Sequence, residues 1–301
     1  MDSAGSAVRP VRDRRAAANV GRHARLDLVF ARRAGRTVLA HAYAEPPFRI
    51  GRAFPDGQGV RMILAWCAPG IFGGDVLEQH VRVERGARVR LTSQSAMQAH
   101  PSADGAVART TSVYRVEDEG ELVCHWDPLI PFADAQLEQQ IDIGLGERAS
   151  LVWSDAFMAG RVGSRPASAG SHPAGFGVAG ERWAFADLSH ELRIARGESL
   201  EYLERYRIAP RDRRVDAAWI AGASSHIGTI VASGRPVDAR SVTALHEELA
   251  KVDGVHAAAD RLDGGLAVVR LMADSGVPFR EARNLALQAL ARSAPERVPS
   301  I

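Results

Sequence analysis

The chain has 301 residues, and 46% of them are hydrophobic, which is enough apolar surface for one large domain. Its 38 lysine and arginine residues are nearly balanced by 36 aspartate and glutamate residues, so the net charge of +2 argues against a dedicated nucleic-acid-binding protein. Two cysteines, Cys67 and Cys124, are too few for a secreted disulfide scaffold, and we expect both to be reduced thiols in a cytoplasmic protein.

No segment is expected to enter a membrane. The longest apolar run, residues 62–72, is broken by Pro69 and Gly70 and is too short to span a bilayer. Residues 1–21 contain several arginines but no apolar stretch, so we expect a disordered tail and no signal peptide. An arginine-rich transit peptide is the less favoured alternative for this segment.

Strand patterns dominate from residue 24 to residue 270. The segment ARLDLVFARRAGRTVLAHAYAE indicates two strands around a turn at 33–35. The segment LEQHVRVERGARVRLTSQS alternates apolar with polar or charged residues on both sides of a turn at 84–86. The same arrangement recurs with turns at 118–120, 144–147 and 196–198.

This even spacing of strand pairs predicts a mainly β fold. A sandwich, a barrel and an irregular β-helix-like stack of strands all fit it, whereas alternating βαβ units do not. We expect residues 22–240 to form this scaffold. Residues 160–181, rich in glycine, serine, alanine and proline, are predicted to be a long flexible loop within it.

The character of the chain changes near residue 241, where a small α-β-β-α unit is predicted as part of the same domain. It extends to residue 293 and is followed by a tail at 294–301. A first helix is indicated by apolar residues at helical spacing, and a hairpin is centred on Gly264 and Gly265. A second helix opens with Pro278. Its apolar face is expected to consist of Leu285, Ala289 and Leu290.

Motifs for catalysis or tight metal binding are missing from the sequence. No G-x-G-x-x-G precedes a predicted helix, and the P-loop, H-E-x-x-H, C-x-x-C and G-x-S-x-G patterns do not occur. Cys124 and His125 are neighbours in a predicted strand, so their side chains point to opposite faces and cannot share one ion. We expect no catalytic residue and no tight metal site. An enzyme of unknown reaction on a β scaffold and a structural β protein with no metal role remain alternatives.

Two carboxylates fall among large apolar side chains when strand parity is followed. In SLVWSDAF, Asp155 shares a face with Trp153 and Phe157. In SLEYLERYRI, Glu204 shares a face with Tyr202. A buried carboxylate is costly unless it is paired, hydrogen-bonded or bound to a cation. Each carboxylate is therefore either half of a salt bridge with an arginine or part of an interior surface that handles cations.

The stretch PGIFGGD places three glycines and an aspartate within six positions. Gly70, Gly73 and Gly74 are predicted to form a structural turn, because glycine adopts backbone conformations that other residues resist. Asp75 stands at the entrance of the following strand. It either forms a turn hydrogen bond with nearby backbone or faces the interior.

Several segments, taken in their order and spacing, together resemble the urease accessory protein family UreD, called UreH in some organisms. The similarity covers roughly residues 22–293, nearly the whole chain. The segments are RLDLVFARRAGRTVLAHAYAEPPFRI, APGIFGGD, GARVRLTSQSA, DPLIPFADAQ, VWSDAFMAGR, GERWAF and GGLAVVRLMADSGVPFREARNLALQAL.

The resemblance implies a β-helix-like scaffold with terminal helices that is not itself a catalyst. Its implied partners are UreF, the nickel-binding GTPase UreG and the urease apoprotein, and neither nucleic acid nor a membrane is among them. It implies no tightly bound cofactor, but a transient passage of Ni²⁺ toward the urease active site. We expect Asp75, Asp155 and Glu204 to line that passage, since carboxylates spaced along a path release an ion more readily than a closed ligand set does.

Overall fold

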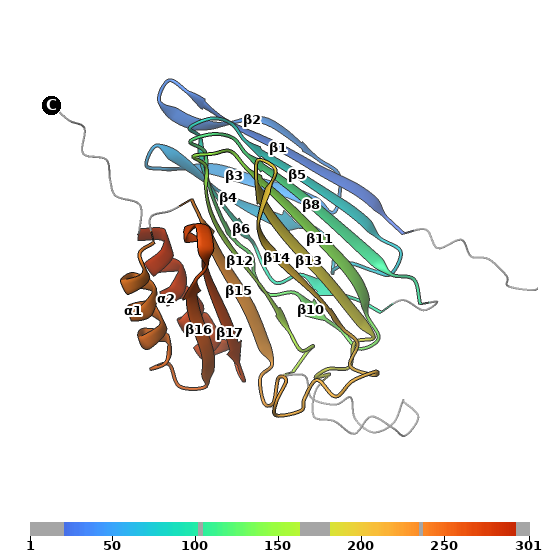
Figure 1. The fold of residues 1–301 in the computed structure, drawn as a ribbon. Coiled ribbons are helices and arrows are strands. Elements are labelled where there is room, and N and C mark those ends of the chain that lie inside the picture. The colour runs from blue at the N-terminus through green and yellow to red at the C-terminus, as the bar shows by residue number, and fades with distance from the viewer. Residues whose placement is uncertain (1–20, 102–104, 163–180, 235–236, 293–301) are drawn as a thin grey trace, which may run out of the picture.

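The computed structural model describes residues 21–101, 105–162, 181–234 and 237–292. Figure 1 shows two large sheets facing each other, with helices α1 (Ala239–Leu249) and α2 (Gly276–Arg292) on one side. The expected tails, apart from Gly21, and residues 163–180 of the expected loop lie outside the described residues. No helix in the described ranges is both long and apolar enough to cross a bilayer.

Two sheets, which we call sheet A and sheet B, contain nearly all the strands. The strands of sheet A, in spatial order, are β14 (Ser199–Ile208), β13 (Asp187–Arg196), β11 (Gln136–Leu145), β8 (Ala108–Val116), β5 (Val76–Val83), β1 (His23–Arg33) and β2 (Arg36–Ala44). The strands of sheet B are β16 (Val255–Arg261), β17 (Ala267–Ala273), β15 (His226–Ser233), β12 (Ser150–Met158), β9 (Glu121–His125), β6 (Arg88–Ser93), β4 (Gly59–Trp66) and β3 (Phe48–Asp56). A small third sheet pairs β7 (Gln98–Ala99) with β10 (Ile130–Pro131).

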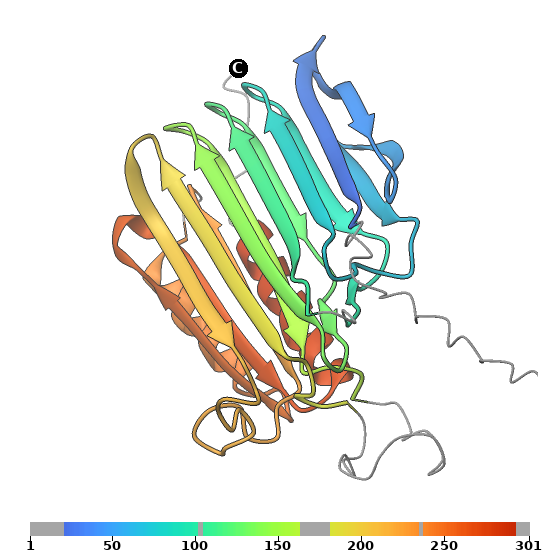
Figure 2. The same ribbon diagram turned by 90° about the vertical axis from the view of Figure 1, so that its right-hand side faces the viewer.

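In the middle of the chain, from β5 to β12, the chain crosses from sheet A to sheet B after each sheet A strand, whereas β1–β2, β3–β4, β13–β14 and β16–β17 are antiparallel pairs within one sheet. Strand β5 leads to β6, β8 to β9 and β11 to β12, each through a tight turn visible at one edge of the stack in Figure 2. Each new strand runs parallel to the strand already beside it, as in β5–β8 and β8–β11 of sheet A and β6–β9 and β9–β12 of sheet B. The prediction of a mainly β, β-helix-like scaffold is therefore confirmed.

The predicted turn at 84–86 is one of these crossings. The amide of Ala87 donates to the carbonyl oxygen of Glu84 over 3.0 Å, and Gly86 has a φ of 68°, in the left-handed region that favours glycine. The turns predicted at 118–120 and 144–147 also join the two sheets, at the same end of the stack.

Side chains that alternate inward along each strand fill the space next to these turns. Leu151 and Trp153 of β12 are buried between the sheets, and the ring of Tyr114 from β8 meets the Trp153 ring edge-on at a centroid distance of 5.1 Å. The inward positions farther from the turns are more polar. That change divides the interior into an apolar half and a half that contains a cavity.

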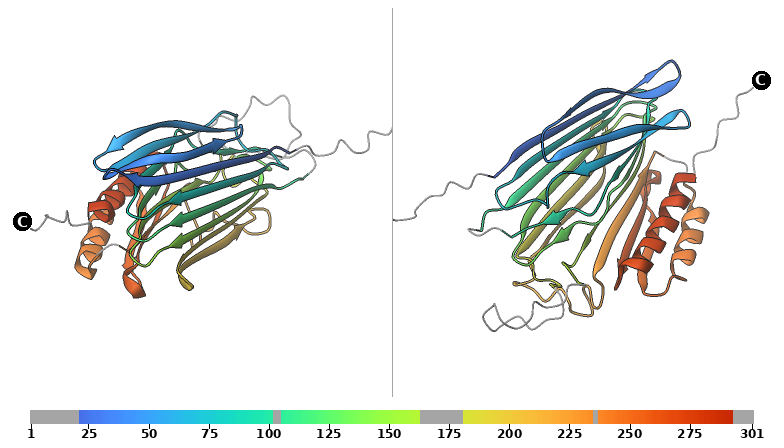
Figure 3. Two further views of the ribbon diagram at one scale, coloured as in Figure 1. Left: turned by 90° about the horizontal axis from the view of Figure 1, so that it is seen from above. Right: turned by 180° about the vertical axis from the view of Figure 1, so that it is seen from behind.

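The C-terminal segment forms the predicted α-β-β-α order, and β16 and β17 extend sheet B. Asp238 caps α1 by accepting a hydrogen bond from the Ser241 amide over 2.7 Å. The helices lie over the outer face of β12, β15, β16 and β17 (Figure 3). Val123 of β9 still packs in the cluster that contains the buried residues of α2, whereas β6, β4 and β3 are not covered by the described parts of α1 or α2.

The buried face of α2 differs from the prediction. Leu290 is buried as expected, but Leu285 and Ala289 are only half-buried. The rest of the buried face consists of Phe279, Ala282, Ala286 and a charged residue, Arg283. The face predicted from the apolar pattern is therefore rotated by about one residue from the observed face. The prediction left out Arg283, which is part of the packed surface.

Arg283 is buried because backbone groups of sheet B hold its guanidinium. It donates to Ser154 Oγ over 2.8 Å, to the Ser154 carbonyl oxygen over 3.0 Å and to the Trp126 carbonyl oxygen. Burial lowers its pKa to about 10, so it stays protonated at neutral pH. The side chain joins α2 to β12 and to the segment that follows β9.

We predict that Arg283→Leu lowers the free energy of unfolding by about 2–4 kcal/mol, because two buried carbonyl oxygens lose their charged donor. Urea denaturation measures this loss. Arg280→Leu, at an exposed position of the same helix, is the matched control and should change stability by less than about 0.5 kcal/mol. Equal midpoints for the two variants would contradict the assignment.

Candidate functional site

Asp75 fastens the start of β1 to the glycine turn. Its side chain is almost fully buried and accepts hydrogen bonds from the amides of Arg22 and Phe72, over 2.8 and 2.9 Å. The Arg22 guanidinium binds the same carboxylate, with Nη2 2.5 Å from Oδ2. Burial alone would raise the pKa of Asp75, but these hydrogen bonds outweigh it and lower the pKa. Both the turn hydrogen bond and the arginine pair are therefore present at this position.

Two of the three predicted turn glycines have a structural reason, a close backbone approach at Gly70 and a positive φ at Gly74. A Cβ atom on Gly70 would lie 2.3 Å from the Gln98 carbonyl oxygen. Gly74 has a φ of 86°, and a Cβ atom on Gly21 would collide with its carbonyl group. Gly73 is outside the left-handed region, and the structure gives no reason for glycine there.

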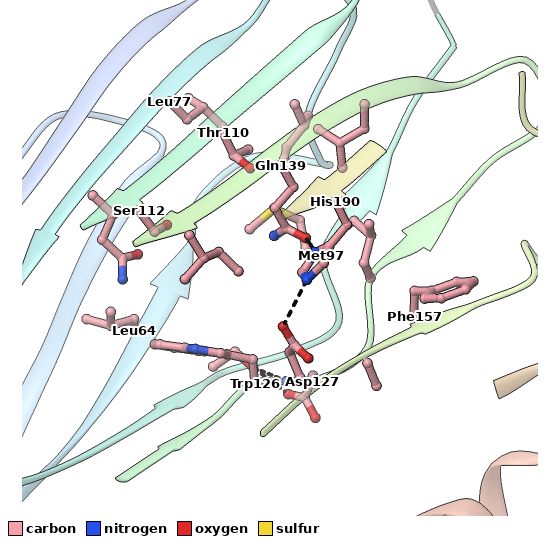
Figure 4. A pocket seen from close by; sticks show the side chains of 18 of the residues that line it. Leu64, Leu77, Met97, Thr110, Ser112, Trp126, Asp127, Gln139, Phe157 and His190 are labelled. Carbon is pink, nitrogen blue, oxygen red and sulfur yellow. Dashed lines mark hydrogen bonds and ion pairs between the residues drawn. The ribbon is translucent and has the colours of Figure 1, made fainter. Parts of the chain in front are cut away.

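A cavity of about 170 Å³ lies between the sheets, in the half of the interior away from the tight turns. Asp155 and Glu204 both line it, whereas Asp75 does not. The structure therefore brings together two of the three carboxylates that the sequence singled out. Figure 4 looks into the cavity, with Thr110, Gln139 and His190 on one wall and Trp126 and Asp127 on the opposite side.

A polar row crosses the inner face of sheet A. Thr110 of β8, Gln139 of β11, His190 of β13 and Tyr206 of β14 are register partners on successive strands. His190 Nδ1 lies 3.0 Å from Gln139 Oε1, and its ring stacks on that of Tyr206 at a centroid distance of 4.8 Å. Since an amide oxygen only accepts, Nδ1 carries the proton in this contact, and Nε2 is left to face the cavity.

Asp155 of β12 faces this row from sheet B. Its Oδ2 accepts a hydrogen bond from Trp153 Nε1 over 3.1 Å and lies 3.9 Å from His190 Nε2. That second separation is too long for a hydrogen bond. Burial raises the pKa of Asp155, although the nearby His190 and the Trp153 hydrogen bond partly oppose the effect. Among the described residues, no arginine lies within ion-pair distance of Asp155.

Glu204 has the arginine partner that Asp155 lacks. Its carboxylate binds the Arg270 guanidinium and accepts hydrogen bonds from Tyr202 Oη, over 3.1 Å, and Thr229 Oγ1, over 3.3 Å. The Glu204 side chain is 7% exposed and that of Arg270 is 49% exposed. Arg270 therefore covers Glu204 from the solvent side, where β14 of sheet A approaches β15 and β17 of sheet B.

The cavity also meets solvent where β6 and β9 end. Gln94, Ser95 and Asp127 line it and are exposed. Ser93 Oγ donates to Asp127 Oδ2 over 2.9 Å and so joins the two strand ends. A carboxylate therefore marks this mouth, and a second one, Glu204, lies at the side closed by Arg270.

Two buried polar atoms that line the cavity, Thr110 Oγ1 and Trp66 Nε1, have no protein partner. Buried polar groups of this kind are normally satisfied by ordered water. A cavity of about 170 Å³ has room for several waters. The interior is thus suited to a hydrated ion.

Within the described ranges, no three histidine, cysteine, aspartate or glutamate side chains come close enough to hold one metal ion. Cys124 faces the core and His125 the opposite side, as strand parity predicted, and neither cysteine is in a disulfide. What the cavity offers is a set of spaced oxygen and imidazole donors that can contact a cation one or two at a time.

His190 and Gln139 were missed by the sequence analysis, although the signal for them was the same as for Asp155. Each is a polar residue at an inward position of an alternating strand. His190 lies two residues from Leu188 and from Leu192, and Gln139 interrupts the apolar series of β11 in the same way.

Comparison of the sequence with known proteins places this chain in a family. The family model described as UreD urease accessory protein matches residues 22–301. A urease accessory protein UreD of Sorangium cellulosum is 34% identical over 255 residues, which cover 83% of this chain and 74% of that protein. A UreD of Deinococcus radiodurans is 28% identical over 236 residues, covering 74% and 77% of the two chains. A UreH of Helicobacter pylori strain P12 is 25% identical over 221 residues, covering 73% and 77%.

We predict that Asp155→Asn stabilises the protein near neutral pH. Because the pKa of Asp155 is raised in the folded state, folding stability falls as the pH rises through that pKa, and the whole cost is present above it. The amide has no such cost, and its oxygen can still accept from Trp153. Urea denaturation between about pH 4 and pH 8 should show a difference that grows with pH and then levels off.

The control for this measurement is Glu78→Gln, at an exposed position on the outer face of β5. It should follow the wild type at every pH. A loss of stability in Asp155→Asn at neutral pH would mean that the ionised carboxylate holds the fold together, and it would contradict a net cost of burying that charge.

Asp75→Ala is predicted to act in the opposite direction, with a loss of about 2–4 kcal/mol in the free energy of unfolding. It removes the acceptor for two amides and leaves Arg22 unpaired, although solvent at the partly exposed guanidinium limits the penalty. Since the pKa of Asp75 is lowered on folding, the wild-type advantage should be lost as the pH falls through that pKa. Urea denaturation at neutral and acid pH tests both points, and equal stability of the two proteins at neutral pH would exclude this structural role.

Proposed function

The chain belongs to the UreD family of urease accessory proteins, and on this premise we propose that it is a scaffold through which nickel reaches the urease apoprotein. Family membership gives it a role in urease maturation. In the proposal, the chain docks UreF and the GTPase UreG on the apoprotein in the cytoplasm. It holds no resident cofactor and catalyses no reaction of its own.

The observation that carries the proposal is the polar row opposite Asp155 in a cavity large enough for a hydrated ion. Burying such a row between two sheets costs free energy, because apolar residues at the same positions would be buried more favourably. Its donors are of the kinds that Ni²⁺ accepts, carboxylate oxygen and imidazole nitrogen. They lie on both walls, so an ion between the sheets meets ligands from each side.

Weak, spaced ligands suit transfer better than a closed site does. A path must attract the ion strongly enough for entry and release it quickly enough for exit. Asp127 stands at the mouth, Asp155 and His190 face each other inside, and Glu204 lies at the side covered by Arg270. In the proposed passage each group replaces part of the hydration shell in turn.

Arg270 gives this path a closed state. Its guanidinium neutralises Glu204, and a divalent cation at Glu204 would be repelled by it at close range. Because half of the Arg270 side chain is exposed, it can turn into solvent without unfolding the sheet. Exit on this side therefore requires Arg270 to leave Glu204.

We predict that the double variant Asp155→Asn, Glu204→Gln still assembles with its partners but yields urease with less nickel. Both substitutions keep the side-chain shape and remove one negative charge each. The nickel content of each urease, matured by complexes first shown to be intact by size-exclusion chromatography, is the measurement. We expect a loss of several-fold in nickel loaded at limiting Ni²⁺.

The matched control is Glu138→Gln, Glu191→Gln, which removes two carboxylates from the outer face of sheet A. It should load nickel like the wild type. Normal loading by the cavity variant would rule out Asp155 and Glu204 as parts of a passage. Loss of partner binding before any loading defect would instead favour a purely structural role for the ion pair.

A further inference from the structure

The outer face of sheet A is neutralised by ion pairs between neighbouring strands. An arginine on one strand meets a carboxylate at or beside the next strand, so the surface carries many charges but little excess of either sign. The pairs are Arg82 with Glu117, Arg109 with Glu138, Arg115 with Asp142, Arg205 with Glu191 and Arg207 with Asp187.

The part of sheet B that the helices leave uncovered has a different balance. Its strands β3, β4, β6 and β9 direct five arginines and two carboxylates outward. We call this set the arginine face, and it consists of Arg49, Arg52, Arg61, Arg88, Arg90, Asp56 and Glu121. Its excess of three positive charges exceeds the net charge of the whole chain, which is +2.

Only two of these arginines are neutralised. Arg88 lies 3.2 Å from Glu121, and Arg90 lies 3.2 Å from Asp56. No carboxylate in the described part of the chain is within ion-pair distance of Arg61. The same holds for Arg49 and Arg52. The five arginines of sheet A named above are also exposed and each has an acidic neighbour, so exposure alone does not account for the difference.

Two of the arginines stand side by side. Arg61 of β4 and Arg90 of β6 are register partners in a parallel pair, where adjacent strands are about 4.8 Å apart. Like charges at such positions destabilise a sheet, and here the exposed ion pair of Arg90 with Asp56 offsets part of the repulsion. A carboxylate of a partner placed between the two side chains would neutralise Arg61 and could also bind Arg90.

Apolar side chains accompany the charges. Phe54 is the register partner of Arg61 on β3, and Ile63 follows two residues later on β4; they are 41% and 40% exposed. A hollow of about 220 Å³ lies beside Arg88 and Arg90, between β6, β9 and the end of α2. The hollow is lined by the two ion pairs of the face, whereas Arg61, Phe54 and Ile63 lie on the open strand surface outside it. Arginines without an ion-pair partner beside exposed apolar groups are typical of a protein–protein contact.

We propose that the arginine face docks an acidic segment of a partner protein, with its carboxylates on Arg61 and Arg90 and an apolar side chain against Phe54 or Ile63. This inference extends the docking part of the proposed function and does not depend on the nickel passage. A nucleic acid fits less well, because the basic area is confined to a few strands and includes apolar side chains that no phosphate would contact.

The test uses the full chain and a fluorescently labelled synthetic peptide. In this peptide glutamate residues alternate with leucine-containing acidic repeats. Fluorescence anisotropy should show binding that weakens as salt is raised. Arg61→Glu, Arg90→Glu is expected to weaken it at least tenfold, since two attractive charges become repulsive (about 1.4 kcal/mol for each tenfold loss). The control Arg240→Glu, Arg280→Glu makes the same change of net charge at exposed positions of the two helices and should bind like the wild type.

If the double glutamate variant fails to fold, Arg61→Gln, Arg90→Gln replaces it. That variant removes the repulsion within the sheet together with the exposed ion pair of Arg90 with Asp56, which contributes about 1 kcal/mol or less. Its stability should therefore stay close to that of the wild type, while its peptide affinity should still fall. Equal peptide binding by the arginine-face and helix variants overturns the proposal. Tighter binding of duplex DNA or of phosphatidylserine vesicles than of the peptide, through the same two arginines, also overturns it.

A pull-down with UreF and the urease apoprotein separates this inference from the proposed function. If the wild type captures neither protein but still binds the peptide through Arg61 and Arg90, the urease scaffold role fails while the acidic-segment site stands. If the arginine-face variant captures both proteins as the wild type does and also keeps its peptide affinity, this inference fails alone.

Discussion

In-register stacking of parallel strands is the constraint on which the interior depends. Thr110, Gln139 and His190 meet only because β8, β11 and β13 are aligned so that each is the register partner of the next. A slip of one residue in any of these strands would turn its polar residue outward and an outer residue inward. The turns that follow these strands oppose that slip, since each fixes where its strand ends: β8 and β11 end in tight turns to sheet B, and β13 ends in the hairpin turn to β14. The cavity is therefore a product of the repeat itself and needs no dedicated loop or lid.

The same repeat explains how the fold tolerates a polar interior. Near the turns the inward positions are apolar and packed, with Trp153 and Tyr114 at the boundary. Farther along, the polar groups mostly satisfy one another, as Gln139 does with His190 and Tyr202 with Glu204. An unsatisfied buried polar group costs about 1–3 kcal/mol. Water in the cavity would supply the missing hydrogen bonds and so contribute to the stability of the fold. The packed half provides stability, and the polar half contains the cavity of the proposed path.

Much of this arrangement could be predicted from the sequence, because short-range sequence patterns determine it. Period-two alternation and glycine turns indicated the strands and the stacked fold, and parity identified Asp155 and Glu204 as inward carboxylates. Pairing could not be predicted, since Arg22 lies 53 residues from Asp75 and Arg270 lies 66 residues from Glu204. Contacts over such separations depend on which strands become neighbours. The face of α2 was mispredicted for a related reason, because two backbone carbonyl oxygens of sheet B make burial of its arginine favourable.

The three carboxylates show how position in the stack sets their chemistry. Asp75 lies at a strand end beside a fixed arginine and is held ionised, so it stabilises the fold. Glu204 shares its charge with an arginine that is half in solvent and able to leave. Asp155 has no such partner, and burial raises its pKa. Arg283 lies behind it, on the outer side of β12, where it favours the ionised form without being able to enter the cavity. The charge of Asp155 is thus partly stabilised by Arg283 from the outer side of β12 but has no counter-ion within the cavity. A cation in the cavity would supply that counter-ion, and for that reason we place Asp155 at the centre of the proposed path.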